Sequence, residues 1–219
     1  MKKRTPLIMT TRQSSYLETA YPRGINIKYV DLLTDYLVRN YFRNSIGFLL
    51  DIGCGRGEYV VAFNMQGFLA SGVDREVDFE KDRLPFPHGS FDYIFSKSTM
   101  EHIWNTQHIL GEVLRVLKPD GIVVFMVPDW ERQIKCFWDD TTHIKPFTKK
   151  GLIQAFTLAG FKDIKCDYFY QLPFLWRYRW LKFVPHIINL LPVSKWKGDK
   201  QRVLIRHSKE RMLLCSCVK

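Results

Sequence analysis

The 219-residue sequence lacks several features that would place it in familiar protein classes. No uncharged apolar run reaches about 18 residues, so no membrane-spanning helix is expected. The apolar stretch behind the basic residues 2–4 is too short for a signal sequence. Five scattered cysteines without zinc-type spacing are typical of a reducing compartment, and no repeat or low-complexity segment is visible. These absences predict a cytoplasmic, globular protein.

What is present fits one well-buried α/β domain, because 219 residues are too few for two ordinary domains. We expect a flexible arm over residues 1–24 and a single domain over 25–219. Within this domain we expect a core over 46–170, an insertion over 171–208 and a final strand over 211–218.

The net charge of +11 is concentrated in the C-terminal quarter of the chain. Residues 1–161 carry 20 Lys and Arg against 18 Asp and Glu, a balance of +2. Residues 162–219 carry 13 against 4, a balance of +9. Such an asymmetry bears on the partners of a protein rather than on its fold.

A glycine-rich loop over residues 53–57 is the most informative motif. The apolar run before it predicts a buried parallel strand, and a helix is expected to follow from residue 59. Glycines permit positive φ angles and let the backbone approach a ligand closely. The N-terminus of the following helix favours an anion. The motif therefore predicts a nucleotide-type site at the carboxyl end of the strand.

The residues around this loop leave the nucleotide open. The dinucleotide pattern G-x-G-x-x-G does not fit, because the third glycine is Glu58 counted from Gly53 and Val60 counted from Gly55. Asp74, which ends the next apolar run, can accept two ribose hydroxyls. NAD and S-adenosylmethionine both carry such hydroxyls, so these residues indicate only an adenosine-type ligand.

Six segments in a fixed order narrow the choice. They are LLDIGCGRG at 49–57, GVD at 72–74, DRLPFP at 82–87, SFDYIFS at 90–96, MEHI at 100–103 and EVLRVLKPDG at 112–121. Together they resemble the class I S-adenosylmethionine-dependent methyltransferases, specifically the type 11 methyltransferase domain, over residues 48–160. The resemblance implies an α/β fold with a Rossmann-like, doubly wound, mostly parallel sheet, and S-adenosylmethionine as cofactor. Only seven residues separate Asp74 from Asp82, so we expect one sheet edge to be abbreviated to a loop.

The same resemblance implies roles for single residues. The glycine loop and Asp51 would hold the methionine part of the cofactor, Asp74 the ribose, and Asp82 with Leu84 the adenine. Asp51 could instead cap the following helix, Asp82 could be an ordinary loop acid, and Lys97 could be a surface lysine. The cofactor-binding residues predicted in this way are Asp51, Gly53, Cys54, Gly55, Gly57, Asp74, Arg75, Asp82, Leu84, Ser96, Lys97 and Ser98.

The long loop over residues 128–147 is the expected acceptor side. Methylation of a hydroxyl needs a base, for which histidine is suited, and a nearby carboxylate can fix its tautomer. We therefore predict His143 as the catalytic base, with Asp140 or Asp139 as its partner. These residues could instead only stabilise the loop by hydrogen bonding. Two adjacent acids and one histidine are weak evidence for a metal, so we do not expect a metal site here. The Glu-His pair of the MEHI segment is interpreted as a dipole-complementing acid and a packed histidine.

Aromatic and aliphatic residues are interleaved with basic ones over 172–197. Trp and Tyr favour the membrane–water boundary and long cations reach headgroups, but this segment is too charged to span a membrane. We predict a helical insertion that makes a peripheral membrane contact or covers a lipid-linked substrate. A hydrophobic lid packed on the domain is the alternative, and nucleic acid is not an expected partner because the basic residues lie among aliphatic ones.

These patterns predict a cytoplasmic methyltransferase, placed at the inner face of the membrane if the insertion contacts it. We expect it to O-methylate a saccharide or lipid-linked glycan, an assignment that rests on family analogy. Two alternatives stay open: an N- or C-methyltransferase of a small lipophilic metabolite, and a non-catalytic, cofactor-binding scaffold at the membrane. The oligomeric state is not predicted.

Overall fold

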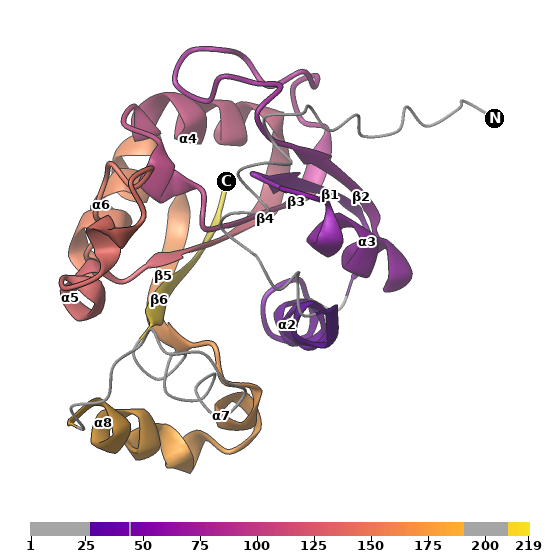
Figure 1. Ribbon diagram of the computed structural model, residues 1–219. Coiled ribbons are helices and arrows are strands. Elements are labelled where there is room, and N and C mark those ends of the chain that lie inside the picture. The colour runs from indigo at the N-terminus through magenta and orange to yellow at the C-terminus, as the bar shows by residue number, and fades with distance from the viewer. Residues whose placement is uncertain (1–26, 44, 191–209) are drawn as a thin grey trace.

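The computed structural model describes residues 27–43, 45–190 and 210–219 (Figure 1). The predicted arm over 1–24 and the end of the predicted insertion, over 191–208, lie outside the described residues.

A six-stranded sheet in the order β2-β1-β3-β4-β6-β5 forms the centre. The strands are β1 (Phe48–Ile52), β2 (Leu69–Val73), β3 (Phe91–Lys97), β4 (Leu117–Pro128), β5 (Lys162–Tyr170) and β6 (Arg211–Val218). The first four pair in parallel, and β6 lies antiparallel between β4 and β5. This topology confirms the predicted Rossmann-like, mostly parallel α/β sheet.

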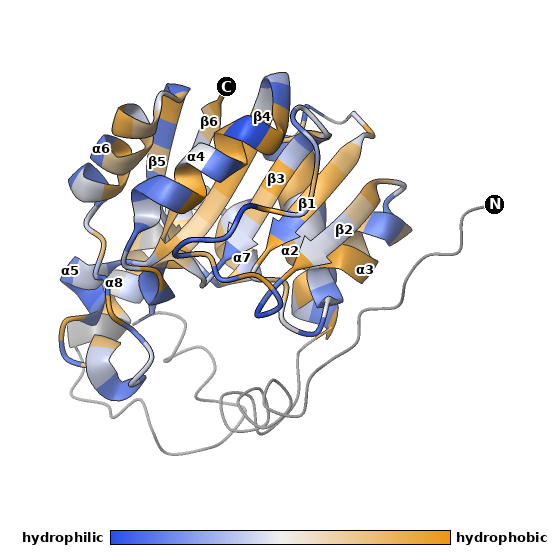
Figure 2. Ribbon diagram, turned by 90° about the horizontal axis from the view of Figure 1, so that it is seen from above, coloured by the Kyte–Doolittle hydropathy of each residue, from blue (hydrophilic) through white to orange (hydrophobic). Residues whose placement is uncertain are grey.

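Helices cover both faces of the sheet, so its parallel strands are apolar on both sides (Figure 2). The helices α4 (Thr106–Val116) and α6 (Lys149–Ala159) pack on one face. The helices α2 (Ile27–Asn40) and α3 (Glu58–Met65) pack on the other. Neighbouring strand residues therefore enter different cores: Ile94 packs with α4, whereas Phe95 packs with α3.

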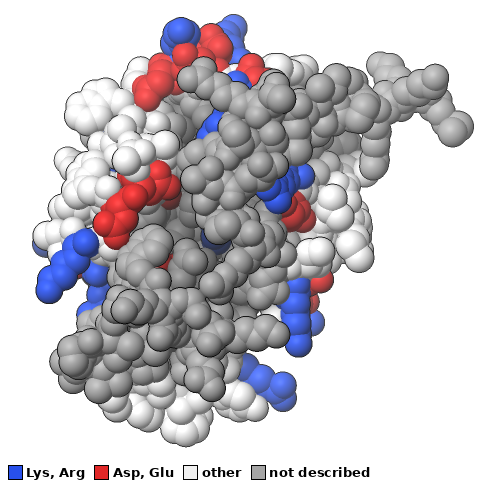
Figure 3. Space-filling view, in the orientation of Figure 1, with Lys and Arg blue, Asp and Glu red and all other residues white. Residues whose placement is uncertain are grey.

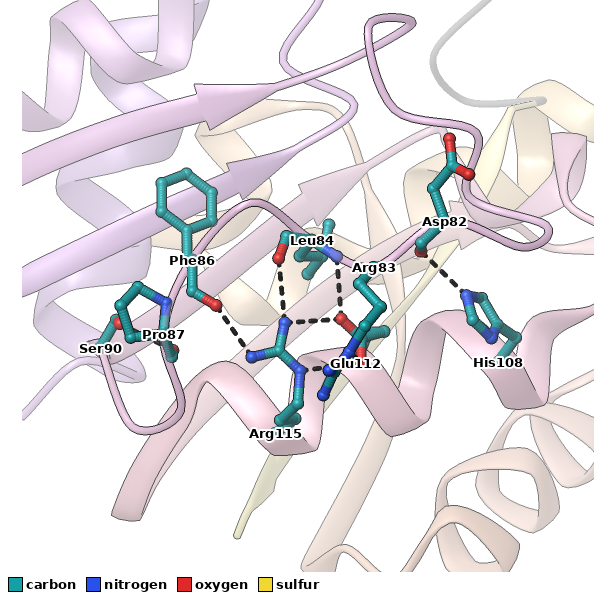
Figure 4. A network of polar contacts seen from close by, with 9 residues as sticks. All are labelled: Asp82, Arg83, Leu84, Phe86, Pro87, Ser90, His108, Glu112 and Arg115. Carbon is teal, nitrogen blue, oxygen red and sulfur yellow. Dashed lines mark hydrogen bonds and ion pairs between the residues drawn. The ribbon is translucent and has the colours of Figure 1, made fainter.

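The sheet ends at β2, and residues 74–90 form turns and loops in place of a further strand and helix. This confirms the predicted abbreviated edge. The loop is fastened to α4 by a buried network (Figure 4). Glu112 accepts the backbone N–H of Leu84 at 2.8 Å, and Arg115 donates to the carbonyl oxygens of Leu84 and Phe86 at 2.9 and 2.8 Å. Glu112 and Arg115 also form an ion pair at 2.6 Å. These polar contacts hold against α4 the loop that stands in place of a further strand and helix.

The helix α4 ends at Val116 and β4 begins at the next residue, Leu117, although Pro119, Asp120 and Gly121 are residues typical of a turn. The pairing of β3 with β4 shifts register here, from Phe91–Leu117 to Tyr93–Ile122. Asp120 has a φ of 58°, so the turn-forming residues make an irregularity inside the strand.

Short helices make up the remaining connections. They are η1 (Met100–His102), α5 (Trp130–Gln133), η2 (Phe137–Asp139), α7 (Pro173–Arg177), η3 (Arg179–Lys182) and α8 (Phe183–Leu190). Two of them, α5 and η2, lie in the segment 128–147 that was expected to be a plain loop. Figure 1 shows α7 and α8 as a lobe beyond the ends of β5 and β6. Among the described residues, no helix is both long and apolar enough to cross a membrane.

Candidate active site

The glycine loop between β1 and α3 depends on glycine for two different reasons. Gly53, Gly55 and Gly57 have φ angles of 75°, 55° and 82°, which side-chain-bearing residues rarely adopt. At Gly53 there is also no room, because an added Cβ would lie 2.0 Å from the hydroxyl oxygen of Thr99. At Gly57 an added Cβ would meet nothing within 4 Å. The loop is therefore packed against the protein at its start and open at its end.

The open end of the loop begins α3. Gly57 is the N-cap and supplies no side-chain cap, so N–H groups of the first turn are left for other partners. Glu58 lies in that turn and complements the helix dipole. A carboxylate at this position disfavours a pyrophosphate and favours a cationic group.

Asp51 is the buried acid of the site. It is 2% exposed, and its Oδ2 has no hydrogen-bond partner among the described residues. Burial, with the charges of Asp74 and Glu58, raises the pKa of Asp51 well above its usual value, against the opposing charge of Lys97. An unpartnered buried carboxylate beside an open glycine loop suits an ammonium group, as in the amino-acid end of S-adenosylmethionine. The residues present therefore fit that cofactor.

The predicted adenosine contacts are less uniform. Asp74 follows β2 directly and is half-buried. Cys54 packs beneath Gly72, where an added Cβ would lie 2.6 Å from its sulfur, so this thiol has a packing role. Asp82 is exposed, and its Oδ2 accepts the backbone N–H of Asp78 at 3.0 Å. The adenine role of Asp82 stays a prediction.

Two of the predicted positions have contacts of their own. Leu84 is 2% exposed and lies within the core between the sheet and α4, which leaves little of it for an adenine ring. Arg75 is exposed, and its charge contributes to lowering the pKa of His102, so it lies near the acceptor side. Their roles toward the cofactor also stay predictions.

Hydroxyl groups at the end of β3 hold β1 in place. Ser96 donates to the carbonyl oxygen of Ile52 at 2.7 Å, and Thr99 donates to the same oxygen at 3.2 Å. Ser98 has a φ of 57° and donates its N–H to Met126 at 2.8 Å. Ser96 is therefore a positioning residue for the glycine loop, and so is Thr99, which the sequence reasoning missed. Only the register of β1 on β3 reveals these bonds.

Lys97 joins the two sides of the site. It is half-buried rather than a fully solvated surface lysine. Its positive charge acts to lower the pKa of both Asp51, on the cofactor side, and Glu101, on the acceptor side. The two acids therefore share one electrostatic environment at the carboxyl ends of β1 and β3.

His143 is held by a backbone carbonyl. Its Nδ1 lies 2.7 Å from the carbonyl oxygen of Phe137, which can only accept, so Nδ1 carries the proton and Nε2 keeps a lone pair. The nearest acid, Asp140, has its Oδ2 3.9 Å from Nε2. The expectation that a carboxylate fixes the tautomer of His143 is wrong. The Asp140 Oδ1 instead accepts the hydroxyl and N–H of Thr142, at 2.6 and 2.9 Å, in a local turn. Asp139 is exposed.

Glu101 is a second buried acid, close to His143. It is 1% exposed, and both of its carboxylate oxygens lack a hydrogen-bond partner among the described residues. Burial raises the pKa of Glu101 to about 8. Glu101 does lie in the first turn of η1, as a dipole-complementing acid would, but its burial was not foreseen.

His102 completes this group. Its ring centroid lies 4.9 Å from that of His143, and its Nδ1 lies 3.0 Å from the carbonyl oxygen of Thr142. One candidate ligand atom from each of Glu101, His102 and His143 lies within 4.8 Å of the others. The segments meet because the backbone carbonyl of Glu101 accepts the N–H groups of Ile144 and Lys145, at 2.9 and 3.0 Å.

The first helix of the insertion is packed on the domain. The Trp176 ring lies 5.1 Å from Tyr36 and 5.2 Å from Phe169, and its Nε1 donates to the carbonyl oxygen of Tyr170 at 2.8 Å. Beyond it, Trp180 is 71% exposed and Phe183 is 50% exposed. Part of the insertion is therefore a lid on the domain, and part presents aromatic surface.

The described surface holds only part of the basic excess. Figure 3 shows described acidic and basic side chains in small groups of both signs. Residues 191–209 carry six Lys and Arg against one Asp, a balance of +5, and lie outside the described residues. They account for more than half of the +9 in the C-terminal quarter.

Comparison with known proteins agrees with this geometry. The sequence model of the family described as the methyltransferase domain matches residues 27–165. An uncharacterised protein of Methanocaldococcus jannaschii is 30% identical in an alignment of 126 positions that covers 51% of this chain and 48% of that protein. The ubiquinone biosynthesis O-methyltransferase of Rhodopseudomonas palustris is 25% identical in an alignment of 126 positions that covers 46% of this chain and 50% of that enzyme. The chain thus spans about half the length of these curated relatives.

A crystal structure of an S-adenosylmethionine-dependent methyltransferase from Archaeoglobus fulgidus superposes with a TM-score of 0.62 at 18% identity. The alignment covers 94% of this chain and 99% of that protein, and it shows a shared fold. Because the family model spans more than half of the sequence, the chain belongs to the methyltransferase domain family, and its fold is that of the class I methyltransferases.

Proposed function

We propose that this protein transfers the methyl group of S-adenosylmethionine to a hydroxyl oxygen, with a saccharide or lipid-linked glycan as acceptor. The observation that carries the proposal is the state of His143. Its Nδ1–H is fixed by the carbonyl of Phe137, so its Nε2 lone pair is available to take a proton. An amine acceptor with a free lone pair would not need such a base, which favours oxygen over nitrogen.

On the cofactor side, Asp51 binds the ammonium group and the glycine loop contacts the methionine part through its backbone. Asp74 accepts the ribose hydroxyls. The bound cofactor supplies an electrophilic methyl carbon on a positively charged sulfur. The protein contributes position and the exclusion of water, which are the main requirements of an in-line displacement.

On the acceptor side, His143 Nε2 takes the hydroxyl proton as the oxygen attacks. A bond forms between the acceptor oxygen and the methyl carbon, and the carbon–sulfur bond breaks with its electron pair on sulfur. The products are a methyl ether and S-adenosylhomocysteine, and the proton leaves His143 to solvent.

One feature supports methylation of oxygen, and two support a lipid-linked acceptor. Curated relatives include proteins named as O-methyltransferases, such as the one in ubiquinone biosynthesis and the 27-O-demethylrifamycin SV methyltransferase of Amycolatopsis mediterranei, the latter 27% identical over 33% of this chain and 35% of that enzyme. The exposed Trp180 and Phe183 can lie against a lipid tail or membrane surface. The basic C-terminal quarter suits the phosphates of a lipid-linked acceptor.

The test is His143→Asn. The Asn amide nitrogen can still donate to the carbonyl of Phe137, but the variant has no base at the position of Nε2. We expect methyl transfer to a panel of saccharides and lipid-linked glycans to fall by at least about 100-fold. Binding of S-adenosylmethionine, measured by calorimetry, should stay within about twofold. Full activity of the variant would contradict oxygen methylation with His143 as base.

A further inference from the structure

The group formed by Glu101, His102 and His143 has the composition of a metal site. It offers one carboxylate and two imidazoles, with ligand atoms within 4.8 Å of one another. The first two residues belong to η1 after β3, and the third to the loop after β4. Such donors at the carboxyl ends of neighbouring parallel strands lie where ligands bind in open α/β sheets.

Both histidines are oriented in the manner of metal ligands. The Nδ1 of His102 lies 3.0 Å from the Thr142 carbonyl oxygen, and the Nδ1 of His143 lies 2.7 Å from that of Phe137. Each carbonyl accepts a hydrogen bond from Nδ1–H, so in the neutral ring the lone pair lies on Nε2. In metal sites the nonligating ring nitrogen is held by a carbonyl or carboxylate in this way, which fixes the tautomer and ring direction.

The carboxylate of Glu101 gives an independent indication. It is 1% exposed, and neither oxygen has a hydrogen-bond partner among the described residues. A buried polar group without partners is rare in folded proteins and calls for a ligand or ion. A cation bound by one oxygen of Glu101 and by the two imidazoles would give this carboxylate the partner that it lacks.

We propose that Glu101, His102 and His143 bind a divalent transition-metal cation such as Zn²⁺ or Mn²⁺. Two nitrogens and one carboxylate suit such ions, whereas Ca²⁺ and Mg²⁺ prefer oxygen donors. Three protein ligands leave a coordination position open, as in sites that act on a substrate. The Oδ2 of Asp140 lies 3.9 Å from His143 Nε2, so this acid is close to the proposed ligand set.

The open position would take the acceptor hydroxyl, and this part of the inference rests on the proposed function. The cation lowers the pKa of a bound hydroxyl, so its O–H bond breaks with the proton passing to water. The resulting alkoxide attacks the methyl carbon, and the carbon–sulfur bond breaks to give the ether and S-adenosylhomocysteine. With the ion bound, His143 is a ligand instead of the proton acceptor. Metal binding itself does not depend on any acceptor.

The test uses the full chain, dialysed against a chelator and titrated with Zn²⁺, Mn²⁺ or Mg²⁺ alone. Calorimetry for Zn²⁺ and electron paramagnetic resonance for Mn²⁺ should show one site per chain, with Mg²⁺ much weaker. Glu101→Gln, His102→Asn and His143→Asn should each weaken binding by at least about tenfold. His88→Asn, at an exposed histidine outside the cluster, should leave it unchanged.

Thermal unfolding gives a second readout, because the ion should raise the melting temperature of the wild type and not that of the three variants. No binding, or equal binding by wild type and the cluster variants, would overturn the proposal. Loss of activity in His143→Asn without any metal binding would remove this inference and keep the proposed function. Metal binding without methyl transfer to any hydroxyl acceptor would keep the metal site and contradict the proposed function.

Discussion

The cofactor side and the acceptor side of this site are built in different ways. On the cofactor side, β1, the glycine loop, α3 and β2 follow one another within about 25 residues, and backbone geometry forms most of the proposed binding site. On the acceptor side, η1 and the loop after β4 contribute side chains that are 41 and 42 residues apart. The cofactor side is therefore encoded by one contiguous motif. The acceptor side is assembled from distant segments only when the sheet forms.

The largest effect is expected where the glycine loop has no room. In Gly53→Ala the new methyl group would meet the hydroxyl of Thr99 at 2.0 Å and sit at a φ of 75°. We expect a loss of about 2–5 kcal/mol in unfolding free energy, from overpacking and the left-handed backbone together. Binding of S-adenosylmethionine should be lost.

The matched control is Gly57→Ala, where the φ is 82° but nothing lies within 4 Å of the new methyl. Here only the backbone term of about 1–2 kcal/mol applies. Denaturant unfolding and calorimetry on both variants would check the pair. Equal destabilisation would mean that the contact with Thr99 is not what makes the start of the loop rigid.

The next largest effect concerns the buried Asp51, where one substitution should weaken cofactor binding and stabilise the fold. Asp51→Asn should weaken S-adenosylmethionine binding by about 10- to 100-fold, the loss of a charged hydrogen bond of about 1.5–3 kcal/mol. The same change should stabilise the free protein at neutral pH. Burial raises the pKa of Asp51 in the folded state, so ionising it opposes folding.

The sign of this pH dependence is defined. The wild type has the full contribution of a neutral Asp51 below the usual carboxyl pKa, and it loses that contribution as pH rises toward the raised folded-state pKa. The amide that replaces this carboxyl in Asp51→Asn does not titrate, so the difference in unfolding free energy should grow in favour of the variant as pH rises. Urea titrations at several pH values would measure it. Parallel curves for the two proteins would contradict a raised pKa.

These two predictions concern residues that the sequence already identified, and the reason is locality. Gly53 and Asp51 follow directly from a strand that ends in glycines, since short-range geometry fixes what surrounds them. Thr99 was missed because its hydroxyl reaches Ile52 only through the register of β1 on β3. Periodicity predicts that strands pair but not which residues face one another.

The acceptor side was predicted only in part, for a related reason. His143 and Asp140 were identified from their chemistry and lie close together, but the turn that Asp140 makes with Thr142 was not foreseen. The burial of Glu101 was not foreseen either, and its backbone carbonyl accepts the N–H groups of Ile144 and Lys145 from the loop beside it. Sequence reasoning assigned the acid to helix-end electrostatics, and tertiary contacts decided its burial.

A medium effect is expected on the aromatic surface of the insertion. Trp180→Ser removes a side chain that is 71% exposed, so stability should change by no more than about 0.5 kcal/mol. Co-sedimentation with vesicles containing anionic lipid should fall severalfold if this surface contacts a membrane. Phe183→Ser, at a neighbouring exposed ring 6.3 Å away, should act in the same direction.

The contrasting variant is Trp176→Ala, whose ring packs on Tyr36 and Phe169. It should destabilise the protein by about 2–4 kcal/mol while leaving the exposed surface in place. Vesicle binding that is unchanged by Trp180→Ser and Phe183→Ser would assign these rings to acceptor binding or to packing with other parts of the chain.

The smallest effect is expected for Asp140→Asn. This variant distinguishes a role of Asp140 in holding the turn from a role in the reaction. If Asp140 only holds the turn, Asn keeps an acceptor for the Thr142 N–H, and methyl transfer should fall by less than about fivefold. Burial acts to raise the pKa of Asp140, but hydrogen bonds from Thr142 and the two nearby histidines bring it below its usual value. This acid therefore stabilises the fold above the usual carboxyl pKa, and that contribution is lost as pH falls through the lowered one.

Because Asp140 is partly exposed, its contribution to stability should stay below about 1 kcal/mol. Steady-state kinetics over pH 5–9 on Asp140→Asn, beside His143→Asn, would measure the difference between the two residues. A fall for Asp140→Asn as large as that for His143→Asn would show that the acid acts on the proton or on the bound ion. The acceptor side would then contain the acid–histidine pair that the sequence predicted, with Asp140 next to Nε2 of His143.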